Sequence, residues 1–114
     1  MNSLDAVNIK LARTGYVKKV IIEKQLADDC YYLDLEILLS YDADLHGDYV
    51  ILKFFNVEEL TIENINPILA IQFVIYDKSN CQLEKTKFYV CDEEHDTFYF
   101  YCEKISFNNE FVSL

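Results

Sequence analysis

The sequence predicts one all-β domain, mainly antiparallel, folded as a sandwich or a partly closed barrel of about seven or eight strands. Three observations predict it. Apolar and polar residues alternate with a period of two along most of the chain, as in half-buried strands. Turn signals separate these stretches roughly every 8–14 residues. The 114 residues are 52% hydrophobic and include only two Gly and one Pro, so residues 1–114 form a single domain without a linker.

The N-terminal fifteen residues fit two local structures. Ser3 would cap a short helix that stops at Gly15. The apolar face of that helix would consist of Leu4, Val7 and Leu11. A strand is the alternative, because Val7, Ile9 and Leu11 also alternate with polar residues. Both remain open at this point.

The next two stretches predict a hairpin. Residues 16–24 are rich in Val and Ile, and the polar stretch 25–29 leads into the strand 31–41. One face of that second strand consists of Tyr31, Leu33, Leu35, Ile37 and Leu39. The other face is mainly polar, with Leu38 as the exception, which is the pattern of an antiparallel strand with one buried face.

The middle of the chain predicts a loop and then a bent strand. Residues 42–48 form the loop, because they combine Gly47 with clustered Asp. A strand follows at 49–55, and its apolar face continues at Leu60 and Ile62 after a bend or bulge at 56–59. Residues 64–67 end this element because of Pro67.

The last third predicts a strand at 69–77, a turn at 78–80, and a hairpin of strands 85–92 and 97–107. An odd loop of three or five residues would place Val90 opposite Phe98 and Phe88 opposite Phe100, which joins apolar faces. An even loop would pair the faces wrongly.

Charge narrows the partner class. The net charge is −10, and the five basic and two acidic residues of 1–24 give +3, which leaves −13 for residues 25–114. Such a field repels nucleic acids and anionic membranes and attracts basic partners. We therefore expect a basic protein partner and binding to neither nucleic acid nor membrane.

The cysteines and the chain start predict a reducing compartment. No stretch looks like an export signal, and no apolar run approaches the roughly 18 residues of a membrane span. The four cysteines show neither a CxxC pair nor zinc-like spacing: Cys30, Cys81, Cys91 and Cys102. We expect a cytoplasmic protein with free, buried or half-buried thiols.

Two acidic loops resemble known chemical motifs in part. The 42–48 loop has Asp at positions one and three and Gly at six of a calcium loop, but His46 and Lys53 occupy positions five and twelve, which excludes an EF-hand. The 92–96 loop gathers carboxylates around His95, which is typical of a solvated turn or of a metal or acid–base site. The chain has no GxSxG and no glycine-rich phosphate loop. We expect no catalytic residue, metal or cofactor.

Tyrosines form a second candidate surface. Tyr99 and Tyr101 point away from Phe98 and Phe100, and Glu103 continues their row. Tyrosines beside carboxylates suit the binding of Lys or Arg. A second buried sheet face is the structural alternative.

The stretch from Tyr49 to Ile62 resembles small bacterial proteins of the polymorphic-toxin immunity type. Its pattern L-x-F-x-x-V-x-x-L-x-I consists of Leu52, Phe54, Val57, Leu60 and Ile62, and Asp92 followed by 98–100 is similar to a late hairpin of that group. The resemblance covers roughly residues 31–105, mainly at core positions, so it carries over no functional residue. It implies a small protein that neutralises a basic toxin domain.

The leading hypothesis is therefore a non-enzymatic acidic binding module of the immunity type. Its candidate partner-binding residues are Asp42, Asp44, Asp48, Asp92, Glu93, Glu94, Asp96, Tyr99, Tyr101 and Glu103. The alternative is a small metal-dependent hydrolase or cation-binding module, which requires the 42–48 and 92–96 loops to converge. A homo-oligomer joined through a sheet edge or the tyrosine face is a third possibility.

Overall fold

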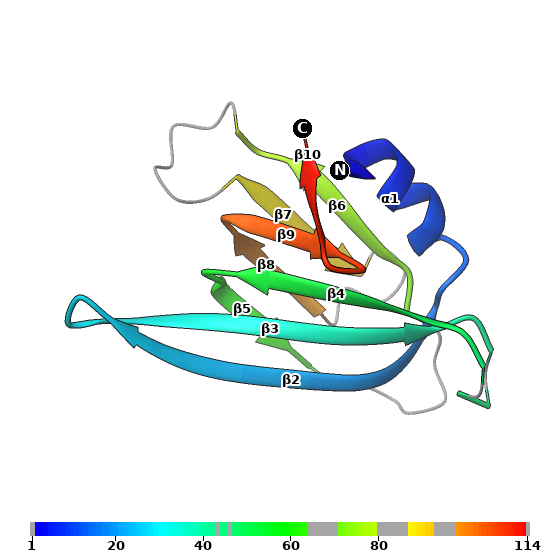
Figure 1. Ribbon diagram of the computed structural model, residues 1–114, viewed down its shortest axis with the longest axis horizontal. Coiled ribbons are helices and arrows are strands. Elements are labelled where there is room, and N and C mark those ends of the chain that lie inside the picture. Colours follow the sequence, from blue (N-terminus) through cyan, green and yellow to red (C-terminus); the bar gives the residue numbers. More distant parts are fainter. Residues whose placement is uncertain are drawn as a thin grey trace.

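The computed structural model describes residues 2–42, 44–45, 47–63, 71–79, 87–92 and 98–113. These residues form one helix and ten strands (Figure 1). The elements are β1 (Asn2–Ser3), α1 (Leu4–Leu11), β2 (Tyr16–Ala27), β3 (Cys30–Ser40), β4 (Tyr49–Phe55), β5 (Glu58–Ile62), β6 (Phe73–Asp77), β7 (Phe88–Asp92), β8 (Phe98–Cys102), β9 (Lys104–Phe107) and β10 (Glu110–Ser113).

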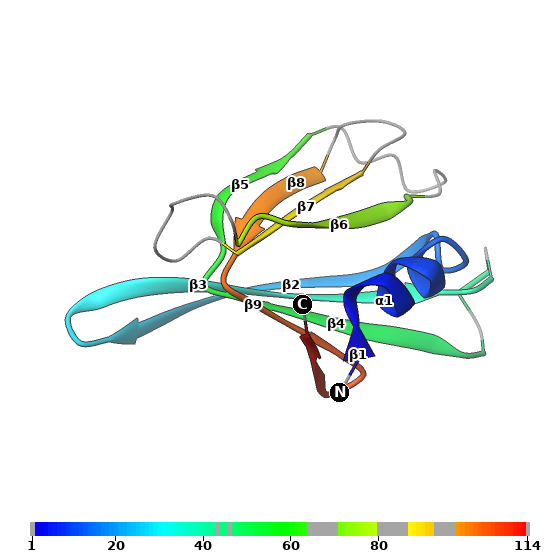
Figure 2. The same cartoon turned by 90° about the horizontal axis from the view of Figure 1, so that it is seen from above.

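The strands form two stacked sheets. The six-stranded sheet has the order β1-β10-β9-β4-β3-β2, and the four-stranded sheet has the order β5-β8-β7-β6. All strand pairs are antiparallel except β1 with β10. Figure 2 shows the two layers, with α1 beside their edge. The all-β prediction is confirmed, and of its two forms the structure adopts the sandwich, not a closed barrel.

The core lies between the inner faces of the sheets. Its largest fully buried side chains include Phe54 of the six-stranded sheet and Phe73, Phe98 and Phe100 of the other. Phe54 and Phe100 meet across the two layers edge to face, with ring centroids 4.8 Å apart. Such pairs stabilise by about 0.5–1.5 kcal/mol beyond the area that they bury. The contact between Phe54 and Phe100 therefore contributes to holding the two sheets together, beside the aliphatic side chains of the core.

Two strands pass from one sheet to the other at a shared corner. The chain bends after β4 at Asn56, whose φ is 55°, and bends again between β8 and β9 at Glu103. The Asn56 side-chain amide donates to the Glu103 carboxylate at 3.0 Å, and the Glu103 N–H donates to the Phe55 carbonyl at 3.0 Å. The predicted bend at 56–59 is confirmed. The predicted single strand at 97–107 is wrong, because the bend at Glu103 divides it between the two sheets.

The N-terminal segment is a helix, which decides between the two alternatives. The Ser3 hydroxyl accepts from the Ala6 N–H at 3.2 Å as the N-cap, and Val7 and Leu11 are buried. The helix ends at Leu11, before the predicted stop at Gly15. Among the described residues no helix is long and apolar enough to cross a membrane.

Helix α1 also covers the edge of β6. The Asn8 amide donates to the Ile75 carbonyl and its oxygen accepts from the Ile75 N–H, each at 2.9 Å. Asn8 thus takes the place of a neighbouring strand at this position. Covering an edge in this way protects it from pairing with other chains.

The β7–β8 hairpin has the predicted parity but a different register. Five residues, 93–97, separate the two strands in the chain, in agreement with the predicted odd loop. Val90 lies opposite Phe100 and Phe88 opposite Cys102, so the predicted pairs are wrong by two residues. A shift of two keeps every side chain on its face. Hydrophobic patterning alone therefore could not distinguish the two registers.

The β2–β3 hairpin extends beyond the second sheet as an arm, whose tip lies at the left end of Figure 1. The predicted hairpin is confirmed, although β2 runs on to Ala27. Leu35, Ile37 and Leu39 are buried as predicted, but Tyr31 on the same face is 68% exposed. Cys30 at the tip is also exposed, which corrects the expectation of buried thiols there, whereas Cys91 and Cys102 are buried. Cys81 lies outside the described residues.

Candidate partner-binding surface

The outward face of the six-stranded sheet carries carboxylates and aromatic rings side by side. Strand register places Glu23 opposite Asp34, and Glu36 between Ile21 and Lys53. Phe111 of β10 is 54% exposed, and its ring lies 5.9 Å from that of Phe55. We call this surface the acidic sheet face and define it as Glu23, Tyr32, Asp34, Glu36, Phe55 and Phe111. None of the described elements lies over its β2 and β3 part (Figure 2).

Two grooves hollow this face. The first has a volume of about 230 Å³ and is lined by Glu23, Asp34, Glu36, Lys53 and Phe55 among others. The second, of about 470 Å³, lies toward β10, and its lining includes Tyr32, Asp34, Phe55, Glu103 and Phe111. Asp34 and Phe55 line both grooves, so they form one continuous surface. An apolar floor with carboxylate walls matches a basic side chain, whose stem is apolar and whose head is charged.

The charges on the acidic sheet face are only partly compensated. Glu23 and Asp34 face each other in register, and like charges directly opposite are destabilising. Asp34 accepts a hydrogen bond from the Asn56 N–H at 3.1 Å. The ion pair of Glu36 with Lys53 is loose, at 3.9 Å, and an exposed pair of this kind contributes little stability. A cation from a partner would relieve the repulsion between Glu23 and Asp34.

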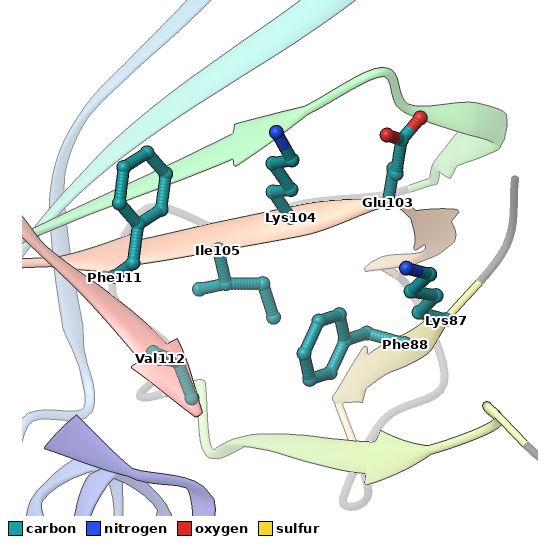
Figure 3. Close-up of a pocket in the computed structure, with 7 residues that line it drawn as sticks. All are labelled: Lys87, Phe88, Glu103, Lys104, Ile105, Phe111 and Val112. Carbon is teal, nitrogen blue, oxygen red and sulfur yellow. The ribbon is translucent and has the colours of Figure 1, made fainter. Parts of the chain in front are cut away.

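A third pocket, shown in Figure 3, adjoins this face at the corner. Its volume is about 300 Å³, and its apolar lining consists of Phe88, Ile105, Phe111 and Val112. The carboxylate of Glu103 and the ammonium groups of Lys87 and Lys104 lie around it. Glu103 and Phe111 also line the larger groove, so the pocket is continuous with the acidic sheet face. Unlike that face, the pocket has both lysines and a carboxylate around it.

The acidic residues predicted from the two loops have different outcomes. Asp42, Asp44 and Asp48 are exposed, at the end of β3 opposite the arm. Asp92 was predicted both as the last residue of the strand 85–92 and as a surface carboxylate of the 92–96 loop. It is the last residue of β7, but it is 0% exposed, so it contributes no surface charge. Glu93, Glu94 and Asp96 lie outside the described residues, as do His46 and His95. Partner contact by the remaining loop carboxylates stays a prediction.

The metal-dependent alternative also stays a prediction, because both histidines lie outside the described part of the chain. Within residues 2–42, 44–45, 47–63, 71–79, 87–92 and 98–113, no three His, Cys, Asp or Glu side chains gather as a metal site would require.

The predicted tyrosine row lies on the outward face of the four-stranded sheet. Tyr99 and Tyr101 are half-buried there, and Tyr101, Tyr89 and Tyr76 occupy adjacent strands. The ring centroid of Tyr89 lies 4.9 Å from that of Tyr101 and 6.3 Å from that of Tyr76. Glu103 does not continue this row, because the chain turns at that residue into the other sheet. Its carboxylate instead lies beside the acidic sheet face.

Most of the acidic sheet face was not predicted from the sequence. Alternation had already placed Tyr32, Asp34 and Glu36 on the polar side of one strand. It could not show that Phe55 and Phe111 lie beside them, because that depends on the pairing of β4 with β3 and of β10 with β9. The sequence does contain one sign of the corner. The period of two in Phe98, Phe100 and Cys102 is broken by a step of three residues to Ile105.

The comparisons with known proteins identify the family. Searches of curated proteins and of solved structures gave no significant match. A family model described as "Immunity protein PIM8" matches residues 1–108, which include α1 and nine of the ten described strands. This match confirms the predicted resemblance and extends it beyond residues 31–105 to the N-terminal helix. The chain therefore belongs to the PIM8 family of immunity proteins.

Proposed function

We propose that this immunity protein neutralises a toxin domain by binding its basic surface through the acidic sheet face, without catalysing a reaction, in the bacterial cytoplasm. The observation that carries the proposal is the outward face of the six-stranded sheet, where Glu23, Asp34 and Glu36 line the same groove as the half-buried Phe55. The fold presents these groups on paired strands, which hold them in place before a partner arrives. Less ordering is then required on binding.

Charge and apolar area have separate roles in this proposal. Exposed ion pairs contribute only about 0.2–1 kcal/mol each, so they cannot supply the whole affinity. They accelerate encounter and select basic partners. Burial of Tyr32, Phe55 and Phe111 supplies the remainder, because aromatic rings are the usual centres of binding energy in interfaces. The residual −13 of residues 25–114 adds long-range attraction.

The test compares two variants that change the net charge equally. E23Q/D34N/E36Q removes three carboxylates from the acidic sheet face, and D42N/D44N/D48N removes three from the exposed loop. Both keep the side-chain size, and the amide that replaces the Asp34 carboxylate retains an oxygen to accept from the Asn56 N–H. Binding is measured by calorimetry and by association rates against the toxin domain encoded in the neighbouring reading frame, at low and high salt.

We expect the face variant to weaken binding by roughly 3–150-fold, since three contacts of about 0.2–1 kcal/mol each are lost. The loop variant should mainly slow association, and this effect should disappear at high salt. Equal losses in both variants would show that only the overall charge matters and would reject this face as the contact surface. If the wild-type chain neither binds nor inhibits the toxin domain at any salt concentration, the proposed function itself is rejected.

A further inference from the structure

We propose that the tip of the β2–β3 hairpin inserts into a cleft of the toxin domain that is lined by basic and apolar side chains. This inference rests on the proposed function and extends the proposed contact from the acidic sheet face to the tip of the neighbouring hairpin. We call residues 22–33 the hairpin arm. It lies along the long axis of a molecule with extents of 41 × 26 × 25 Å (Figure 1).

The hairpin arm carries apolar side chains that no element of the described structure covers. Ile22, Leu26 and Tyr31 are 51%, 64% and 68% exposed. They share the pleat face of Leu35, which is buried in the core, because Ile22 pairs with Leu35 and Leu26 with Tyr31. The apolar row of the core thus continues onto the arm after the second sheet has ended. Exposed apolar surface of this kind is typical of interaction sites.

The charge of the arm indicates which kind of partner surface it can bind. Asp28 and Asp29 form the tip, and Glu23 is exposed on the opposite pleat face. The ammonium of Lys24, on the apolar side, lies over the Tyr31 ring at 5.0 Å. Residues 22–33 therefore carry three carboxylates and one cation. A second copy of the arm, a nucleic acid or an anionic membrane would be repelled, whereas a basic cleft would be attracted.

The turn at the tip is tight and uses an unusual pair of residues. Asp28 and Asp29 both have positive φ, 52° and 61°, as in a type I′ turn. Asn-Gly is the favoured pair for this geometry, because glycine adopts positive φ without a steric penalty. The present pair is therefore less favourable for folding but places two carboxylates at the furthest point of the arm. A substitution at the tip can therefore raise the stability of the turn and weaken binding at the same time, which separates the two effects by experiment.

The first test replaces the tip by the better turn. D28N/D29G should raise the melting temperature, since it supplies the preferred turn, and yet weaken binding of the toxin domain by roughly tenfold or more. The matched control, E59Q/E63Q, removes two exposed carboxylates at the edge of the four-stranded sheet, in and directly after β5, and should change affinity by less than about threefold. A second variant, L26A/Y31A, removes apolar side chains that are exposed in the free protein, so folding should be retained while binding weakens.

The second test uses Cys30 as a reporter, because its thiol is exposed beside the tip. In a C81S background, the Cys30 thiol should react readily with a maleimide in the free protein and at least about tenfold more slowly in the toxin complex, as expected for a buried thiol. The arm contact alone would be overturned by two results together: the D28N/D29G and L26A/Y31A variants bind the toxin domain as tightly as wild type, and Cys30 reacts in the complex as it does in the free protein. A wild-type chain that does not bind the toxin domain would overturn both proposals.

Discussion

Replacing Asn8 should detach α1 from the edge of β6. Asn8→Ala removes two hydrogen bonds of 2.9 Å, one to each backbone polar group of Ile75. Ile75 is buried, so its N–H and carbonyl would lose their partners away from bulk water. A buried group left unsatisfied costs about 1–3 kcal/mol. Because Asn8 is half-buried and water can enter in its place, we expect a total loss of about 2–3 kcal/mol in the free energy of unfolding.

The assay is urea denaturation followed by circular dichroism, with thermal melting as a second measure. For a domain of this size the loss corresponds to a fall of roughly 8–12 °C in melting temperature. Asn8→Asp separates hydrogen bonding from packing, since it keeps the shape but places a carboxylate oxygen against the Ile75 carbonyl. At neutral pH it should cost at least as much as Asn8→Ala. Its deficit relative to wild type should shrink as the pH falls, because a protonated carboxyl can donate again.

The control is Ile9→Ala, the next residue on the same helix, which is exposed and should change the unfolding free energy by no more than about 0.5 kcal/mol. The reasoning is refuted if Asn8→Ala costs as little as this control, or if Asn8→Asp is tolerated at neutral pH.

Two further predictions concern the core and the thiols. Phe100→Ala should lower the free energy of unfolding by about 3–5 kcal/mol, because Phe100 is fully buried against Phe54. In the same urea titration, Phe111→Ala on the exposed face should lower it by less than about 1.5 kcal/mol. Equal losses in the two variants would contradict the assigned core. Burial raises the pKa of the Cys102 thiol. In a C81S variant, a thiol reagent should therefore modify Cys30 in the folded protein and reach Cys91 and Cys102 only after unfolding. Simultaneous reaction of all three thiols would disprove the burial of Cys91 and Cys102.

The elements that were predicted best are those with local causes. Ser3 and the apolar residues one and two turns later specify α1, because an N-cap and a helical stripe involve only near neighbours in the chain. The alternation along 31–41 likewise specified β3 and its two faces. The immunity-type family also followed from the chain itself, since its pattern from Leu52 to Ile62 consists of apolar residues at fixed local spacing.

The candidate site was predicted less well, since it is assembled from strands far apart in the sequence. The Asp-rich loops were predicted to bind the partner because their carboxylates are adjacent in the chain. The acidic sheet face instead unites Asp34 of β3 with Phe55 of β4 and Phe111 of β10 through strand pairing. Asp92 shows the reverse case, because a residue that reads as part of an acidic turn is buried at the end of β7.

The sequence by itself determined that this chain is an acidic all-β protein, where most strands lie, and which face of each is apolar. Tertiary structure decided which sheet each strand joins, and where an apolar strand face is no longer covered by the opposite sheet. Glu103 turns the chain between sheets through contacts with Asn56 and Phe55, nearly fifty residues away, which no local period encodes. Tyr31 continues the same alternation as Leu35, yet it is exposed because the second sheet ends before the arm does. Alternation specifies the side of a strand, and only the packed structure determines whether that side is covered.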